Sequence, residues 1–110
     1  MDSISIQNQV VQLLGSGVTS NGNGNATGKR LLYATFQATV VGTGAVAATV
    51  TLECSNDGVN WCATALGTIT LSGTTTNSDG FTTSAPWPYV RAVVSGISGT
   101  GATVTCLMGE

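Results

Sequence analysis

Charged side chains are scarce in this sequence of 110 residues. They make up 7% of it, as three Lys or Arg and five Asp or Glu, which gives a net charge of −2. A soluble domain of average composition has about a quarter of its residues charged. The cations are Lys29, Arg30 and Arg91, and three cations cannot form a surface that follows a phosphate backbone. We therefore expect no general binding of nucleic acid.

Histidine is absent, and the acids are scattered along the chain. A Ser or Cys nucleophile needs a base, and acid–base catalysis needs two acids in one cleft. Zinc sites take four ligands and calcium sites six or more oxygens. Cys54 and Cys62 lack the short spacing of a zinc knuckle, and Asp57 is accompanied only by the amides Asn56 and Asn60. We expect no enzyme activity, no metal site and no cofactor.

Long apolar runs are also missing, and none approaches 18 residues, so we expect no membrane-spanning segment. The first ten residues, "MDSISIQNQV", have neither a basic region nor an apolar stretch, and we expect no signal peptide. Folding in a reducing cytoplasm follows as the default. Three cysteines, an odd number, fit free thiols better than a disulfide framework. A start at Met1 and an end at Glu110 favour a whole protein over a fragment.

The residues that abound are Val, Thr, Gly, Ser and Ala, which favour strands and turns over helices. Apolar and polar residues alternate with a period of two in several segments, as on half-buried strands. The side chains expected to face inward are Leu32, Ala34, Phe36, Ala38, Val40, Val46, Ala48, Val50, Leu52, Cys54, Ile69, Leu71, Val90, Ala92, Val94, Ala102, Val104, Cys106 and Met108.

Turn signals separate these segments. "GTGA" occurs at residues 42–45 and again at 99–102, and Asp57-Gly58 and Asp79-Gly80 are expected at turn tips. "PWP", residues 86–88, stiffens the entry to the strand that begins at Tyr89. Short strands between regular turns predict an all-β fold, an antiparallel β-sandwich or jelly-roll-like single domain.

The N-terminal part differs from the rest. Residues 1–29 are expected to be an arm followed by a flexible Gly/Asn-rich loop, and residues 30–110 the β-sandwich body. The arm has apolar side chains at Ile4, Ile6, Val10 and Val11. Two interpretations are open: an intersubunit strap, or a first strand of the sandwich with a long loop after it.

The segment "LECSNDGVNWCATALG", residues 52–67, holds two of the three cysteines. With Asp57-Gly58 as a two-residue hairpin turn, Cys54 lies opposite Trp61, and Cys62 lies opposite Glu53 on the other face. This register predicts that the two cysteines cannot form a disulfide. It also places Trp61 in the core, with a ligand platform as the alternative.

Taken together, "ATVTLECSNDGVNW", "DGF…APWPYVRA" and "SGTGATVT" resemble a pattern in small structural proteins of tailed bacteriophages. The resemblance runs from about residue 33 to residue 109. In that group a single domain of this size resembles a capsid decoration, or cement, protein. The resemblance implies binding to the outside of the assembled capsid, where such proteins clamp neighbouring major capsid subunits. It also implies a homo-oligomer (a dimer or trimer), made in the cytoplasm of the host and carried on the virion.

Subunit or capsid contact is expected from the apolar arm residues together with Trp87, Tyr89 and Arg91. Trp87 and Tyr89 are expected either to cap the core or to lie in an interface. Arg91 is expected to pair with Glu53 or Asp79, or to contact a partner. Two other functions stay open: a tail-fibre or baseplate module that binds host-surface glycan, and an accessory domain of an enzyme. The glycan-binding module predicts aromatic and polar side chains gathered at one end of the sandwich.

Overall fold

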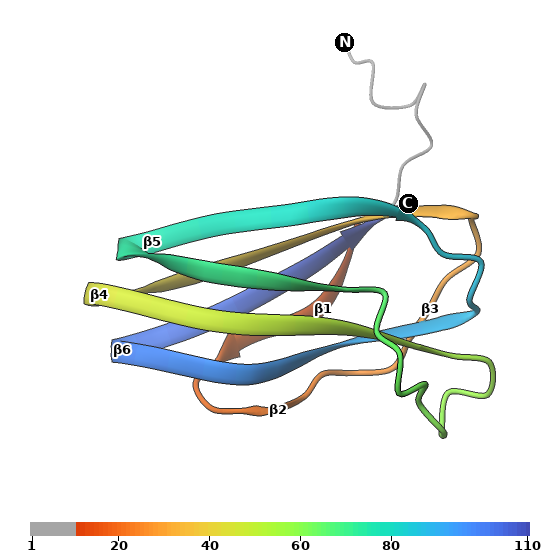
Figure 1. Cartoon of the computed structure of the whole chain (residues 1–110), viewed down its shortest axis with the longest axis horizontal. Coiled ribbons are helices and arrows are strands. Elements are labelled where there is room, and N and C mark those ends of the chain that lie inside the picture. The colour runs from red at the N-terminus through yellow and green to blue at the C-terminus, as the bar shows by residue number, and fades with distance from the viewer. Residues whose placement is uncertain (1–10) are drawn as a thin grey trace, which may run out of the picture.

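The computed structural model describes residues 11–110, with side chains from Gly15 onward. The described residues form six strands and no helix, so they contain no helix that could span a membrane. The strands are β1 (Val11–Val18), β2 (Gly22–Asn23), β3 (Thr27–Gly28), β4 (Tyr33–Ser55), β5 (Gly67–Ser84) and β6 (Tyr89–Gly109). Figure 1 shows how β4, β5 and β6 run the length of the molecule and double back. The predicted all-β class is confirmed.

The three long strands bend at the same end of the molecule, where their regular pairing is interrupted. The bends contain residues with left-handed backbone: Gly44 (φ 72°), Thr75 (φ 63°), Gly99 (φ 117°) and Gly101 (φ 64°). Glycine adopts such angles without the steric penalty of a Cβ. Two of these bends are the "GTGA" segments, which connect strand halves within β4 and β6.

Each long strand therefore contributes one half to each of two layers. In one layer β1 lies beside residues 103–109 of β6, which pair with 33–41 of β4 and, beyond them, 76–84 of β5. In the other, β2 and β3 lie beside residues 89–98 of β6, followed by 45–55 of β4 and 67–74 of β5. All pairs are antiparallel. This arrangement is the predicted antiparallel β-sandwich.

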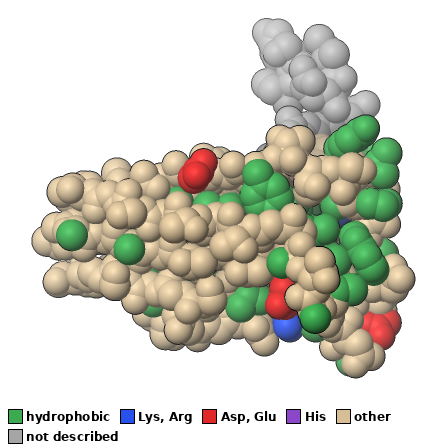
Figure 2. All heavy atoms as spheres, viewed as in Figure 1, with side chains coloured by type: hydrophobic (Ala, Val, Ile, Leu, Met, Phe, Trp, Pro, Cys, Tyr) green, Lys and Arg blue, Asp and Glu red, His purple; other side chains and the backbone are tan. Residues whose placement is uncertain are grey.

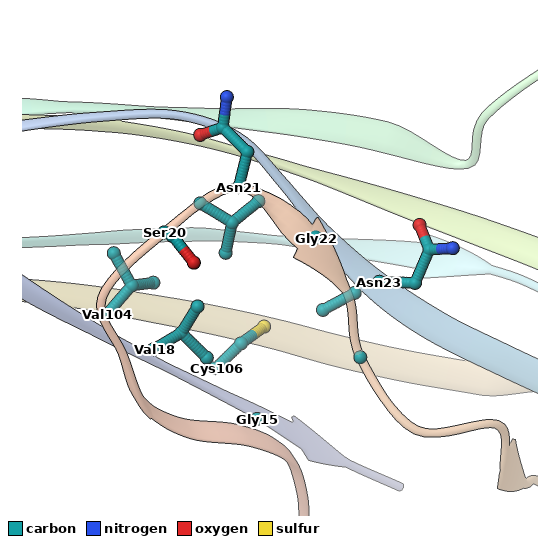
Figure 3. Close-up of a pocket in the computed structure, with 11 residues that line it drawn as sticks. Gly15, Val18, Ser20, Asn21, Gly22, Asn23, Val104 and Cys106 are labelled. Carbon is teal, nitrogen blue, oxygen red and sulfur yellow. The ribbon is translucent and has the colours of Figure 1, made fainter.

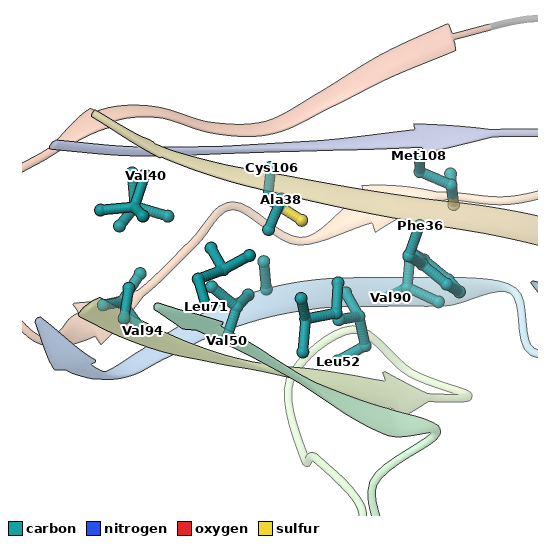
Figure 4. Packing of buried hydrophobic residues seen from close by; sticks show 14 of the residues in the cluster. Phe36, Ala38, Val40, Val50, Leu52, Leu71, Val90, Val94, Cys106 and Met108 are labelled. Atoms are coloured by element: carbon teal, nitrogen blue, oxygen red, sulfur yellow. The ribbon is translucent and has the colours of Figure 1, made fainter. Parts of the chain in front are cut away.

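The core lies between the two layers. Figure 4 shows Phe36, Ala38, Val40, Cys106 and Met108 extending from one layer towards Val50, Leu52, Leu71, Val90 and Val94 of the other. The Phe36 ring also packs on Phe81, with ring centroids 5.3 Å apart. The side chains predicted to face inward are buried, except for Leu32, which is 50% exposed.

The described N-terminal residues join the same sandwich. β1 pairs with the end of β6, and β2 and β3 pair with its beginning, so the segment crosses from one layer to the other. For residues 11–18 this is the first-strand interpretation. Ile4, Ile6 and Val10 lie outside the described residues, and of Val11 only the backbone is described.

The two Asp-Gly pairs do not form the predicted turns. Residues 56–66 form a loop instead of a two-residue hairpin, and the next strand begins only at Gly67. Asp79 and Gly80 lie inside β5, paired with Ala38 and Gln37. A Cβ on Gly80 would lie 2.1 Å from the carbonyl oxygen of Phe36. The glycine is therefore needed for close approach of two strands, a role that the dipeptide alone does not distinguish from a turn.

Candidate contact surface

The two ends of the sandwich differ in chemistry. The bends occupy one end and consist largely of glycine, threonine and alanine. The strands begin and end at the other, where Tyr33 pairs with Ser84 and Ser55 pairs with Tyr89. Both tryptophans and both tyrosines therefore lie at or near this second end, in the strand starts and the two connecting loops.

Large apolar side chains are exposed at this end. Leu31 is 53% exposed, Tyr33 63% and Val59 76%, and Leu32, Trp87 and Tyr89 lie near them in the chain or the sheet. We call these six residues the apolar end: Leu31, Leu32, Tyr33, Val59, Trp87 and Tyr89. Figure 2 shows apolar side chains gathered at the right of the molecule, while few apolar or charged side chains are seen at the left. Contiguous exposed apolar surface is typical of contact sites.

The segment that carries the exposed leucines is held by its backbone. The amides of Arg30 and Leu31 both donate to the Glu110 carboxylate, each at 3.0 Å. The Ala85 amide donates to the Leu32 carbonyl oxygen at 2.7 Å. This part of the surface therefore needs little ordering on binding, which lowers the entropic cost of a contact.

A buried cation completes the support of this segment. Lys29 is buried; its amide donates to the Pro88 carbonyl at 2.8 Å, and its ammonium group donates to the Leu31 carbonyl. Burial lowers the pKa of Lys29, while the charge of Glu110 acts in the opposite direction. The two segments 29–32 and 86–88 enclose an open hollow of about 360 Å³.

Asp57 organises the neighbouring loop. Its carboxylate accepts from the amides of Val59 and Asn60 at 2.9 and 2.8 Å, and from the Asn60 side chain at 2.8 Å. The buried Ser55 hydroxyl lies 2.9 Å from the same carboxylate and 2.6 Å from the Asn60 carbonyl oxygen. The hydrogen bonds from Asn60, then from Val59 and Ser55, hold the pKa of Asp57 well below its usual range. This network shapes the loop, which was predicted to be a two-residue hairpin turn.

Arg91 is bound within the chain. It lies directly across from Glu53, and its Nε donates to the Glu53 carboxylate at 2.7 Å. Its guanidinium carbon also lies 4.4 Å from the centre of the Trp61 ring. Of the partners predicted for Arg91, Glu53 is the one that the structure shows. Trp61 is half-buried in the loop, and its predicted place on a return strand in the core is wrong.

Of the predicted contact residues, the structure brings Trp87 and Tyr89 to the apolar end and places Arg91 beside it. Their role in contact stays a prediction. Leu32 was predicted to face inward, and Leu31 was not predicted as a surface residue. Three large apolar residues in a row cannot all face inward on a strand, because successive side chains point to opposite faces. The run of residues 31–33 was therefore the feature of the sequence that indicated exposed apolar side chains here.

A second hollow lies where the N-terminal segment crosses between the layers. It has a volume of about 240 Å³ and is shown in Figure 3, with Val18, Val104 and Cys106 on its apolar side. Its polar side chains, Ser20, Asn21 and Asn23, are exposed. Burial raises the pKa of the Cys106 thiol to about 11. We interpret this hollow as a packing gap, because no buried polar side chain lines it to give specificity.

No model of a known protein family matches this chain, and no curated protein matches it. Among solved structures, the fold is similar to that of the PBSX exported protein XepA, with a TM-score of 0.50 and 13% sequence identity. The similarity covers 91% of this chain and 36% of the XepA chain, so this chain spans about a third of that protein's length. At this identity, the chain and XepA share a fold.

Proposed function

We propose that this chain is a phage virion structural protein that binds the outside of the assembled capsid and clamps neighbouring major capsid subunits. The observation that carries the proposal is the exposed apolar end, set on a segment fixed by Glu110 and Ala85. The fold shared with XepA, a PBSX exported protein, supports the coarser part of the proposal, a phage-related protein.

The chemistry of the surface favours a protein partner. Leu31, Leu32 and Val59 are aliphatic and exposed, and such side chains gain by transfer from water into a protein interface. A shell repeats the same contact at many sites, so modest contacts add up when each protein bridges two subunits. A binder selective for the assembled lattice stabilises that lattice by mass action. We also propose that the protein acts as a dimer or trimer and catalyses nothing.

The glycan-binding alternative has one observation in its favour. Aromatic and polar side chains are gathered at one end, where Trp61, Tyr89 and Asn60 lie near each other along the loop and β6. Aromatic rings provide stacking faces for sugars. However, Arg91 covers one face of Trp61, and the exposed leucines offer no such face. We therefore place the glycan-binding module second.

The test compares purified phage shells with and without the protein. We expect the protein to bind shells and to raise the temperature at which they lose integrity, with electron microscopy placing it on the capsid exterior. Unchanged shell stability, with the protein found at the tail tip or retained on host polysaccharide, would favour the glycan-binding module instead.

A further inference from the structure

Cys54 and Cys62 lie next to each other at the base of the 56–66 loop. The Cys62 amide donates to the Cys54 carbonyl oxygen at 3.0 Å, which places the two residues side by side. The hairpin register inferred from the sequence paired Cys54 with Trp61, and that pairing is wrong, because the Cys62 amide is hydrogen-bonded to Cys54 instead. Both thiols are free, as is Cys106.

This arrangement suits a covalent bond. A disulfide requires Cα atoms about 4.4–6.8 Å apart, with Cβ atoms facing each other. The direct backbone hydrogen bond between the two residues brings them close enough. The residues between them are already held by Ser55 and Asp57, so the two ends of the loop need not be brought together from a distance.

We propose that Cys54 and Cys62 form a site of reversible oxidation, at which peroxide or a disulfide oxidant converts the two thiols into a disulfide that closes the 55–61 loop. With hydrogen peroxide, the half-exposed Cys62 thiol is oxidised first to a sulfenic acid, and one water is released. The Cys54 sulfur then attacks the Cys62 sulfur. The S–S bond forms as the S–O bond breaks, and the oxygen leaves as a second water with the proton from Cys54.

The surroundings of Cys54 keep the reduced form stable until an oxidant arrives. Burial, followed by the hydrogen bond and charge of Cys62 and the charge of Glu53, raises the pKa of Cys54 to about 11. A thiol with so high a pKa is a poor nucleophile at neutral pH. Cys62 therefore reacts with the oxidant first, and Cys54 attacks only the neighbouring oxidised Cys62, where the short distance offsets its low thiolate fraction.

The Cys54–Cys62 disulfide would restrain a loop that borders the apolar end. The loop it closes carries Val59 and Trp61, and its Gly58 is close enough to Tyr89 that a Cβ there would lie 3.5 Å from the ring. Oxidation would thus fix a loop that borders the apolar end. The inference does not depend on the proposed function, because it concerns only the chemistry of the two thiols.

Trypsin provides a direct assay, because it cuts after Lys29, Arg30 and Arg91. Cys54 and Cys62 stay together on the peptide of residues 31–91, and Cys106 lies on the peptide of residues 92–110. After treatment of the full chain with hydrogen peroxide and blocking of free thiols, we expect peptide 31–91 to be unblocked and lighter by two hydrogen atoms. The reductant dithiothreitol should reverse the change. Peptide 92–110 should carry one blocked thiol.

Two variants make the assay specific. Cys106→Ser should leave the oxidation unchanged, and Cys62→Ser, at a half-exposed position, should abolish it and leave Cys54 blockable in denaturant. The proposal is overturned if peptide 31–91 keeps two blockable thiols under conditions that oxidise free cysteine. A link between peptides 31–91 and 92–110, or a disulfide between two chains in place of the loop bond, would overturn it as well.

Discussion

Asp57 illustrates how one side chain shapes a loop beside the candidate contact surface. Four hydrogen bonds converge on its carboxylate from Ser55, Val59 and Asn60. An Asp before a Gly is usually taken as a turn signal because of backbone angles. Here the carboxylate itself holds three residues together, Ser55, Val59 and Asn60. The loop is therefore expected to respond to the charge of this one group.

We predict that Asp57 makes the stability of the protein depend on pH in the acid range. The folded-state pKa is lowered by the hydrogen bonds from Asn60, while an unfolded Asp titrates at about 3.9. The ionised form thus contributes stability that is fully present above the unfolded value and is lost as the pH falls through the folded value. Thermal melts should show a larger loss between pH 7 and pH 3 for the natural protein than for Asp57→Asn.

The matched control is Asp79→Asn, in β5, where the carboxylate accepts from the neighbouring Gly80 amide at 2.8 Å. This variant leaves the 55–60 network untouched and should keep the acid dependence of the natural protein. If Asp57→Asn lost as much stability in acid as the natural protein, the carboxylate would not be the group that supports the loop.

At the scale of the strand, β1 has two glycines with opposite requirements. A Cβ on Gly15 would meet the Val18 side chain at 3.6 Å, an ordinary contact, and Gly15 lines the packing gap beside β1. Gly17 has φ +60°, in the left-handed region. The register of β1 against β6 is irregular on either side of Gly15, so the strand depends on local backbone geometry.

We predict that Gly15→Ala raises the free energy of unfolding by about 0.4–1 kcal/mol, because it restricts the unfolded chain without strain in the folded one. Gly17→Ala should lower it by about 1–2 kcal/mol, because alanine is strained in the left-handed region. Chemical denaturation of both variants checks the pair. Equal effects of the two substitutions would mean that β1 contributes little to the stability of the sandwich.

The strand pattern could be predicted from the sequence because burial imposes a period of two. The alternation in residues 46–54, for example, identified Val46, Ala48, Val50, Leu52 and Cys54 as inward-facing, and all five are buried. The pattern did not predict how long the strands are. The "GTGA" bends redirect a strand without ending it, and Asp79-Gly80 lies within a strand.

The candidate contact surface was only partly predictable for a related reason. Trp87 and Tyr89 stood out beside prolines, but the exposure of Leu31 and Leu32 depends on hydrogen bonds to Glu110 and Ala85. Those partners are 50 to 80 residues away in the chain, so no local sequence pattern predicts these hydrogen bonds. The contact between Cys54 and Cys62 was hidden because the loop is longer than a tight turn.

At the scale of the molecule, the folding back of three strands separates two kinds of surface. It collects the strand starts, the two connecting loops (residues 56–66 and 85–88) and the exposed tyrosines at one end, and leaves bends of small residues at the other. A protein built this way has one exposed apolar end, which we propose as its contact surface. The opposite end has an exposed apolar residue of its own, Val41, which is 49% exposed beside the bend of β4.

The most direct test of the account is the affinity of the protein for assembled phage shells. The two ends allow a matched comparison, with one substitution at each end. Leu31→Asp changes the apolar end and Val41→Asp changes the other, at sites of similar exposure, with both variants first shown to fold by thermal melts. If binding to the shell buries the Leu31 side chain, its loss is expected to weaken binding by about tenfold to a hundredfold. We predict that loss for Leu31→Asp and near-natural binding for Val41→Asp, measured by co-sedimentation with shells. Equal binding of the two variants, or no binding of the natural protein to shells, would contradict the account.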